Sequence, residues 1–426
     1  MSKTFATLKA EVLSELQDVN AAVWGLTPNT TEIENRLEAA ISEVSDYKPR
    51  IIKYSFKLES RTGTTSSYLN TWLMDTTLDQ FVPTSDVGKA VHNTTTTKPS
   101  DWAASTAYTK GTRISPTSAN GRMYICSTAG TSTTSEPTWP TGVDETVADG
   151  TVTWMHRGVI TEPKWAIVLS SGSNTGTQLN LSKDIMADDE EYEIFNKGCW
   201  DSKQINLSDI VDYVGLNHGV IDVEYPVGTK RNFIVEDDIL TILIDSTIPD
   251  SGDSDSDVEA FVWIKRKHQV TQQTITTMYI DLSAGYAAGT TSIYLDYDSD
   301  AITGTIKAGS DITIGSTRGT YITTADATFG SNQITLSIFP GLESYIADDQ
   351  VVRLLVSSLD TRLERLVVAL TVAKARMSKS GAYISEEFGG SLWRGHFDLA
   401  RTEYVLILDE LKGGRKIAVK PTYPRE

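Results

Sequence analysis

Cysteine and histidine are scarce in this chain of 426 residues, which has two of the former and five of the latter. Cys126 and Cys199 lie far apart in the sequence and lack the spacing of metal ligands, so we expect two free, buried thiols. The histidines do not pair as HxxxH or HExxH, the patterns that place two imidazoles on one helix face. These absences predict that the chain has no zinc site.

Long apolar runs are also missing. No stretch of roughly eighteen apolar residues occurs, and a transmembrane helix needs about that many. The N-terminal segment MSKTFATLKAEVLSELQDVN lacks the apolar centre of a secretory signal. We therefore expect a chain that is made in the cytoplasm, has no membrane partner and stays in the cytoplasm until it is assembled.

Motifs of catalysis are absent as well. The chain has no GxSxG for acyl transfer, no GxxxxGK[ST] for phosphate binding, and no GxGxxG that opens a helix. Carboxylates are abundant, but the sequence marks no two of them as a general acid and base, because their separation in space is not visible. We expect no enzymatic activity and no cofactor.

Positive charge is in short supply, since 38 Lys and Arg face 56 Asp and Glu for a net charge of −18. This balance opposes general affinity for nucleic acid, because phosphate binding needs clustered Lys and Arg. Residues 357–426 differ, with 12 Lys and Arg against 9 Asp and Glu, a net charge of +3. A solvated helix surface accounts for this difference, and a surface that faces a charged partner or a DNA channel is the alternative.

The chain is rich in aromatics between residues 102 and 154, where they are spaced among Gly, Pro, Ser and Thr. Such a composition excludes a helix and predicts a small β-module of short strands. In a unit of about sixty residues the aromatics form the core, whereas any that stay exposed are able to stack on sugar rings. The candidates for either role, module core or glycan binding, are Trp102, Tyr108, Tyr124, Trp139 and Trp154.

The first fifty residues predict a helical hairpin. Thr31 and Glu34 stand at capping-box spacing and mark the start of its second helix, which Lys48-Pro49 ends. Two apolar stripes recur at helical spacing. They are Leu8, Val12, Leu16 and Val19, followed by Ile33, Leu37, Ile41 and Val44.

From Arg50 to residue 356, short segments alternate apolar and polar residues, which is typical of strands. After Ser357 the chain returns to helix, with a loop expected at Ser380-Gly381 and Gly389-Gly390. The apolar stripes of an isolated hairpin would stay exposed, so we expect the helices of the two ends to pack together.

We therefore predict a multidomain α+β protein, with a discontinuous helical bundle formed by the two ends and inserted antiparallel β domains of sandwich or barrel type. The expected parts are a helical hairpin at 1–50, an antiparallel β domain at 51–100 and 161–278, the aromatic β-module at 101–160, a small barrel or sandwich at 279–356, C-terminal helices at 357–412 and an extended tail at 413–426.

Asp253, Asp255 and Asp257 resemble the start of a calcium loop, in which alternating carboxylates point at one cation. The sixth position of such a loop needs Gly but is Val258, and the twelfth needs Glu but is Ile264. An exposed acidic turn explains the pattern better, so these residues form an incomplete candidate metal site.

Three segments together resemble the head–tail adaptor (connector) proteins of tailed bacteriophages. One is the sheet segment GVIDVEYPVG from Gly219 to Gly228, and another is the C-terminal helix pair at 359–379 and 393–412. The third segment is the helical stripe Glu32-Ile33, Arg36-Leu37, Ala40-Ile41, Val44 and Tyr47. In addition, the aromatic stretch resembles a module inserted in structural proteins of such phages, and residues 279–356 look like repeats of virion proteins.

The resemblance implies a homo-oligomeric ring, commonly a dodecamer, in the neck of the virion. Such a ring is assembled in the host cytoplasm, joins the portal protein to the tail terminator or other neck and tail proteins, and lines the DNA exit channel without sequence-specific binding. The irregular, basic tail is then expected to dock onto the portal or a neighbouring subunit. Its candidate docking residues are Arg415, Lys416, Lys420, Tyr423 and Arg425.

Two other functions fit the same features. A carbohydrate-binding decoration or fibre protein would act through the aromatic module, and glycan binding lost on Trp102→Ala or Trp139→Ala would favour it. Another tail or baseplate component would also form a ring and would differ only in the virion proteins that it contacts.

Overall fold

The computed structural model of the chain describes most residues between Lys3 and Gly413. The segments that it does not describe are 1–2, 18–30, 70, 79, 84, 96–98, 119, 160–163, 171, 247, 249–257, 274–275, 298–303, 316, 318–319, 331, 384–389 and 414–426. The chain divides into two compact units. Unit 1 comprises Met1–Tyr54, Asp209–Asp222 and Val262–Glu426, and unit 2 comprises Ser55–Ser208 and Val223–Phe261.

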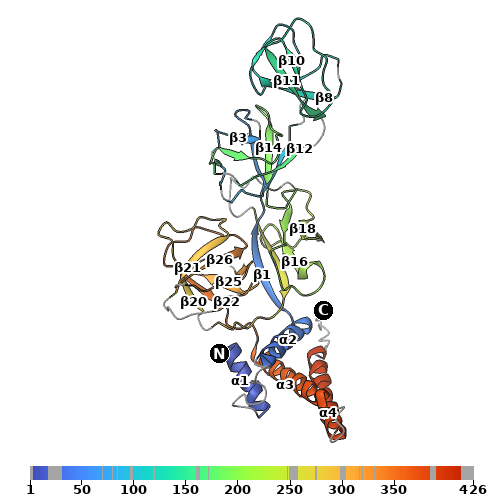
Figure 1. Cartoon of the computed structure of the whole chain (residues 1–426), viewed down its shortest axis with the longest axis vertical. Coiled ribbons are helices and arrows are strands. Elements are labelled where there is room, and N and C mark those ends of the chain that lie inside the picture. Colours follow the sequence, from blue (N-terminus) through green and yellow to red (C-terminus); the bar gives the residue numbers. More distant parts are fainter. Residues whose placement is uncertain are drawn as a thin grey trace, which may run out of the picture. The chain divides into compact units, whose positions relative to one another are not determined.

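The fold is mixed α+β with β-rich domains, as the sequence predicts. The described residues contain four α-helices, two near each end of the chain, and many short β-strands between them (Figure 1). Of the described helices, none combines the length and the apolar composition needed to span a membrane.

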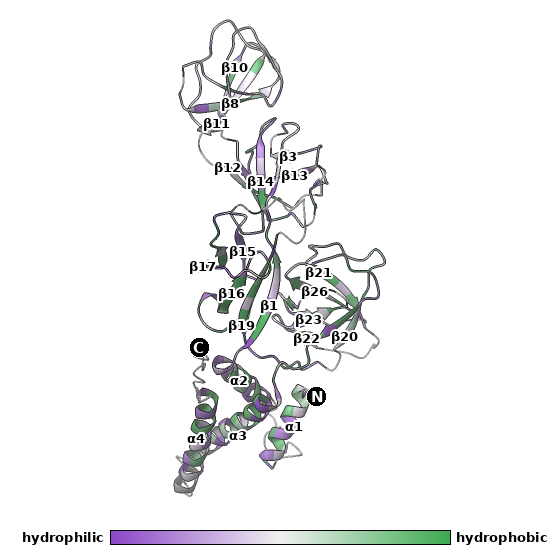
Figure 2. Ribbon diagram, turned by 180° about the vertical axis from the view of Figure 1, so that it is seen from behind, coloured by the Kyte–Doolittle hydropathy of each residue, from purple (hydrophilic) through white to green (hydrophobic). Residues whose placement is uncertain are grey.

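The helices of unit 1 follow the apolar stripes of the sequence. Side chains of all four meet in one buried cluster, which includes Leu8, Leu37, Val367, Leu370 and Leu411. In Figure 2 their ribbons carry both hydrophobic and hydrophilic stretches, as amphipathic helices do. The helices are α1 (Phe5–Glu15), α2 (Glu32–Tyr47), α3 (Thr361–Tyr383) and α4 (Gly390–Lys412).

Two details of these helices differ from the sequence-based expectations. Thr31 precedes α2, but its side chain makes no capping hydrogen bond, and Glu34 instead pairs with Lys9 at 2.6 Å. Ser380 and Gly381 lie within α3 rather than in a loop. The Phe397 ring of α4 packs beside Gly381, and this contact supports the helix past the expected break, where one glycine costs only about 1 kcal/mol relative to alanine. Val19 lies outside the described residues.

His268 connects the end of α2 to the segment before α3. Its Nε2 lies 2.9 Å from the carbonyl oxygen of Lys48, and its Nδ1 lies 3.1 Å from the hydroxyl of Ser358. Its backbone N–H donates to Ser45 Oγ at 2.8 Å. Burial lowers the pKa of His268, so the imidazole is held neutral between these partners.

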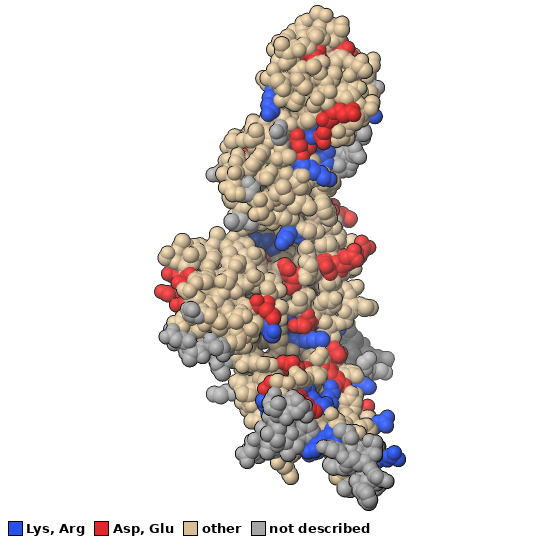
Figure 3. Space-filling view, viewed as in Figure 1, with Lys and Arg blue, Asp and Glu red and all other residues tan. Residues whose placement is uncertain are grey.

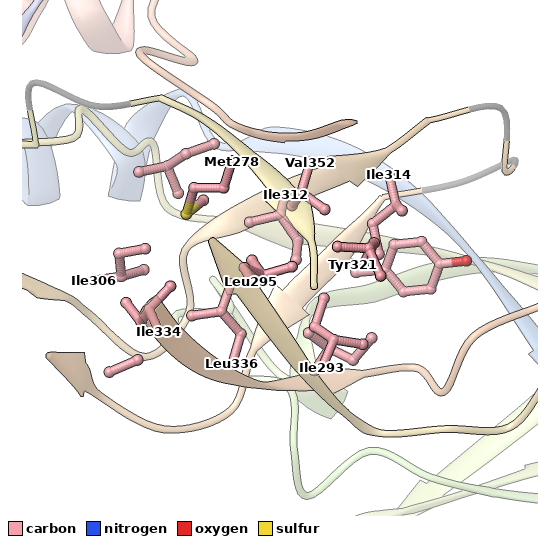
Figure 4. Close-up of a cluster of buried hydrophobic side chains, with 14 of the residues drawn as sticks. Met278, Ile293, Leu295, Ile306, Ile312, Ile314, Tyr321, Ile334, Leu336 and Val352 are labelled. Atoms are coloured by element: carbon pink, nitrogen blue, oxygen red, sulfur yellow. The ribbon is translucent and has the colours of Figure 1, made fainter. Parts of the chain in front are cut away.

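The segment from Thr277 to Leu354 forms a closed barrel with the strand order β20-β21-β26-β24-β23-β27. Alternate residues point inward, and Figure 4 shows aliphatic side chains such as Ile293, Leu336 and Val352 converging between the strands. The barrel strands are β20 (Thr277–Ile280), β21 (Ser292–Asp296), β23 (Asp311–Ile314), β24 (Tyr321–Thr323), β26 (Gln333–Phe339) and β27 (Val351–Leu354), and β22 (Thr305–Ile306) pairs with β25 (Ala327–Thr328).

A buried ionic cluster joins the barrel to the other strands of unit 1. Arg266 is fully buried and donates to Asp311 Oδ1 at 2.7 Å, to the Gly309 carbonyl at 2.8 Å and to Tyr54 OH at 2.9 Å. Arg50 pairs with the same carboxylate. Burial raises the pKa of Tyr54 to about 12, so this hydroxyl stays neutral beside the two guanidinium groups.

Unit 2 is built from small sheets. A four-stranded sheet of order β12-β4-β14-β2 packs one face against the β3–β13 pair, with Val91, Ala166, Leu179 and Ile194 in the shared core. The strands outside the aromatic module are β2 (Arg61–Thr64), β3 (Trp72–Met74), β4 (Ala90–Asn93), β12 (Lys164–Ile167), β13 (Gln178–Asn180), β14 (Glu191–Phe195), β15 (Gln204–Asn206), β17 (Phe233–Glu236) and β18 (Ile239–Ile242).

The aromatic module is a five-stranded sheet of order β10-β11-β8-β7-β5, together with the short β6–β9 pair. Its strands are β5 (Ser100–Asp101), β6 (Ala107–Tyr108), β7 (Arg113–Ser115), β8 (Arg122–Thr128), β9 (Gly130–Thr131), β10 (Thr146–Asp149) and β11 (Val152–Val159). A further sheet has the order β1-β19-β16, and its strands are β1 (Arg50–Lys57), β16 (Val220–Glu224) and β19 (Glu259–Arg266).

Candidate functional site

The five aromatics predicted from the sequence lie together in the module. Trp102, Tyr124 and Trp154 are buried in one apolar cluster, and Tyr108 and Trp139 pack against it with part of their surface exposed. The Tyr108 ring meets Trp154 edge-on, with centroids 4.7 Å apart. The faces of the buried indoles are therefore covered by neighbouring side chains.

Asp149 organises this aromatic cluster from its buried position. Its Oδ2 accepts hydrogen bonds from the indole N–H of Trp102 at 2.8 Å and of Trp154 at 3.0 Å. Its Oδ1 accepts from the backbone N–H and the hydroxyl of Thr133. Burial by itself would raise the pKa of Asp149, but these four hydrogen bonds outweigh burial and lower it. The carboxylate thus cross-links three segments of the module.

The partly exposed aromatics are also fixed by hydrogen bonds. Trp139 donates from its indole nitrogen to Glu136 Oε1 at 2.8 Å, and its ring lies 4.4 Å from that of Tyr124. The Tyr124 hydroxyl donates to the Pro140 carbonyl at 2.8 Å. The Tyr108 hydroxyl accepts from the backbone N–H of Ala103 at 2.8 Å. Tyr108 and Trp139 are the members of the predicted set that keep some exposed ring surface.

His156 lies in the same sheet, opposite Tyr124 in the register of β11 and β8. It is 3% exposed, and neither ring nitrogen has a hydrogen-bond partner among the described residues. Its ring packs 5.2 Å from that of Tyr124. The sequence lacks any signal for this position, because an isolated histidine in a strand reveals neither its burial nor its partners.

Ion pairs and a small apolar cluster hold the module on the rest of unit 2. Arg157 of β11 pairs with Asp184 at 2.7 Å, and Tyr68 donates to the same carboxylate at 2.9 Å. Arg113 of β7 pairs with Glu190 at 3.1 Å. Tyr68 also packs with Ile125, Ala187 and Met155. The insertion is therefore docked through both charge and apolar contact.

Lys164, the first residue of β12, lies near these contacts between the module and the rest of unit 2. Burial lowers its pKa to about 8, and the charges of Arg157 and Arg113 act in the same direction, whereas Glu190 opposes them. Burial also raises the pKa of Asp184 despite its pairing with Arg157. At these contacts, burial thus disfavours the charged forms of both Lys164 and Asp184.

A second group of aromatics lies on the four-stranded sheet, outside the predicted set. The Trp165 and Trp200 rings meet nearly perpendicularly, with centroids 5.3 Å apart, and His92 stacks flat on Trp165 at 4.0 Å. We call these three residues the tryptophan corner. Sequence reasoning missed it because its members come from three distant segments that the sheet brings together.

The remaining sequence-based candidates fall in two classes. Asp253, Asp255 and Asp257 lie outside the described residues, and so do the tail residues Arg415, Lys416, Lys420, Tyr423 and Arg425. Among the residues that are described, no group of three or more His, Cys, Asp or Glu side chains is placed to hold a metal ion. Cys126 and Cys199 are free and buried, as expected, and burial raises their thiol pKa values to about 11 and about 12.

Comparison with known proteins adds no relative, since no family model, no curated protein and no solved structure matches this chain. Any function must therefore be argued from the residues themselves.

Proposed function

We propose that this chain is a virion structural protein of a tailed bacteriophage, a head–tail adaptor that forms a homo-oligomeric ring between portal and tail. In this proposal α1 and α2 from one end of the chain and α3 and α4 from the other act as one discontinuous helical bundle. The bundle forms the ring wall around the DNA exit channel, and the β domains are carried on it as insertions.

The shared apolar cluster of the four helices supports this proposal. Ile33, Leu37, Ile41 and Val44, the apolar positions of the adaptor-like stripe, are all buried in it. The stripe is thus a core that needs the C-terminal helices to cover it. An architecture of this kind keeps the two ends of the chain together whatever is inserted between them.

The observation that carries the proposal is the outer surface of α4. Leu399, Val405 and Leu406 are 60%, 45% and 63% exposed, whereas Ala400 and Leu411 on its inner face are buried. Leu399 and Leu406 are seven residues apart, so they lie two turns apart along one side of the helix. We call these three residues the α4 ridge. Contact with a neighbouring subunit removes such a ridge from water.

Charge on the other helices suits a ring in which different faces of identical subunits meet. Arg365 is exposed on α3, where Arg362 pairs with Glu410 of α4 at 3.2 Å, whereas Glu38 and Asp46 are exposed on α2. Faces of opposite sign favour a head-to-tail contact, which closes into a ring when the rotation fits. On the face drawn in Figure 3, acidic and basic side chains are interspersed, so the described residues there form no broad basic patch of the kind that would hold DNA tightly.

The test is the mass of the purified protein, alone and mixed with its portal, by light scattering and electron microscopy. We expect a closed ring, or a monomer that becomes a ring on the portal. The double variant Leu399→Asp/Leu406→Asp should stay monomeric in both cases. Leu216→Asp is the matched control, because Leu216 is 89% exposed and lies outside the helices. A small trimer that ignores the portal would refute the adaptor proposal.

The tail is tested separately by ending the chain after Gly413. If Arg415, Lys416, Lys420, Tyr423 and Arg425 dock onto the portal, the truncated protein keeps its fold but no longer binds the portal. Portal binding at full strength by the truncated chain would contradict this role for the tail.

A further inference from the structure

The tryptophan corner differs from the aromatic module in its exposure. Trp200 is 49% exposed, which is the largest exposed fraction among the tryptophans whose side chains the structure describes, whereas Trp102 and Trp154 of the module are buried. Its ring meets Trp165 at 77°. Trp165 is covered by His92 and packs on the buried residues Phe195 and Cys199, so the open surface of the pair is that of Trp200.

The exposed indole is held in place by its own loop. The Trp200 backbone N–H donates to Gln204 Oε1 at 2.8 Å, and Cys199 beside it is buried with Phe195 and Ala90. The Cys199 backbone N–H donates to the Asn196 carbonyl at 2.9 Å. The backbone is therefore anchored at Trp200 and at the residue before it, and little backbone freedom remains to be lost when a ligand binds.

Polar groups stand beside the corner in the same row of the sheet. Trp165 of β12 lies opposite His92 of β4, which lies opposite Glu193 of β14. Cross-strand partners share a face, and this face is opposite the one that holds Val91 and Ala166 in the core. Ser60 donates to Glu193 Oε1 at 2.8 Å, so the carboxylate has a set orientation. The row thus presents an indole, an imidazole and a carboxylate in order.

These groups favour a neutral sugar over other flat ligands. The C–H face of a pyranose ring carries slight positive charge and packs on the negative face of an indole, while its hydroxyls donate to carboxylate oxygens. A nucleotide also stacks on tryptophan, but its phosphate would lie near Asp201, the exposed carboxylate that follows Trp200, on a chain of net charge −18. We propose that the tryptophan corner binds a neutral pyranose unit of an oligosaccharide, with Trp200 as its stacking platform.

This site is independent of the adaptor proposal and of the aromatic module. It lies on the sheet that contains β12 and β14 in Figure 1, and none of its residues belongs to the α4 ridge. Loss of the ring and loss of sugar binding are therefore separate results.

The experiment titrates the full chain with cellotetraose, maltotetraose and chitotetraose, followed by calorimetry and tryptophan fluorescence. We expect saturable binding of at least one of the three, weakened at least about tenfold by Trp200→Ala and much less by Trp200→Phe, which keeps an aromatic face. Tyr345→Ala is the matched control, since Tyr345 is an aromatic of the barrel that is 61% exposed and belongs to neither the corner nor the module. Circular dichroism confirms that each variant is folded.

Three results would overturn the proposal. One is that none of the three sugars binds, and another is that the Trp200→Ala variant binds as well as the unaltered chain. The third is that a single-stranded oligonucleotide binds at Trp200 while the sugars do not. If Trp200→Ala changes the oligomeric state and no sugar binds, the corner is a protein interface instead.

Discussion

The barrel and the aromatic module are two small β structures of one chain that are held together in different ways. The barrel core consists mainly of aliphatic side chains such as Ile293, Leu336 and Val352, which need only to fill space. The module core consists of large aromatics that converge on one buried carboxylate, Asp149. The barrel is stabilised by close packing of apolar side chains. The module is stabilised by close packing and also by the hydrogen bonds to Asp149.

The kind of core side chain explains the difference, because the barrel, from Thr277 to Leu354, is only slightly larger than the module. A unit of about sixty residues buries a smaller fraction of its surface than a large domain does, so it gains from side chains that each bury a large area. Indoles provide that area, but each also buries an N–H that must be hydrogen-bonded. Asp149 accepts from both Trp102 and Trp154. The module therefore depends on one residue in a way that the barrel does not.

The largest effect is expected for Asp149→Ala. This change leaves two indole N–H groups and the Thr133 N–H without their acceptor, which costs about 4 kcal/mol of the module's unfolding free energy. The module should unfold while the barrel stays folded. Two-dimensional NMR checks this, since the indole signals of Trp102 and Trp154 would collapse.

Asp149→Asn is the matched control, because the amide keeps one acceptor oxygen at the same place. It should destabilise the module by less than Asp149→Ala. Equal stability of the Asp149→Ala variant and the unaltered chain would show that the carboxylate does not organise the core.

Leu336→Ala should have the next largest effect. Leu336 is fully buried in the barrel, and the cavity left by truncation costs about 3 kcal/mol. Leu336→Met, which conserves volume, should cost less than about 1.5 kcal/mol. Urea unfolding of the barrel measures both values. Similar losses for Ala and Met would contradict a core that is stabilised by volume.

Acid should weaken unit 1 and the aromatic module in different pH ranges. Burial lowers the pKa of His268 in unit 1 from 6.5, so the folded chain takes up this proton less readily than the unfolded chain. That part of the stability of unit 1 is complete above pH 6.5 and falls as the pH drops from 6.5 to the folded pKa. Asp149 in the module has a pKa below 3.8, so its contribution is complete above 3.8 and is lost as the pH falls through the folded pKa.

Urea midpoints between ~pH 7.5 and ~pH 3 test this order, because unit 1 should weaken first. His268→Gln should flatten the decline of unit 1 near neutrality and leave that of the module unchanged. A module that weakens at the same pH as unit 1 would refute the assignment.

The smallest effect is expected for Asp326→Asn on the barrel surface. Asp326 pairs with Lys307 at 2.8 Å, and hydrogen bonds from Lys307 and the Ala308 N–H lower its pKa, as hydrogen bonds do for Asp149. Asp326 is exposed, however, so water replaces these partners when they are lost. The melting temperature of this variant should equal that of the unaltered chain, and a clear decrease would show that exposure is not what separates the two carboxylates.

Much of the fold is predictable from local patterns. The stripe of Ile33, Leu37, Ile41 and Val44 predicts a helix and its buried face, and the alternation in QITLSIF predicts strand β26, because both are set by the spacing of neighbouring residues. The clustering of Trp102 and Trp154 was also predictable, since so short a stretch offers no other core. The absence of the capping hydrogen bond expected at Thr31 was not predictable, because Glu34 forms an ion pair with Lys9 of another helix.

By itself the sequence determined the α+β class, the order of the helical and strand regions, and the scarcity of motifs for catalysis, since these follow from residue types and their periods. Tertiary structure alone decided which polar atoms are buried together and which aromatics stay open to water. Asp149 became a cross-link because β10 passes both indoles, and Trp200 became exposed because a turn anchored by Cys199 holds it on the sheet. Distances between remote segments depend on how the elements pack, and no period in the sequence encodes them.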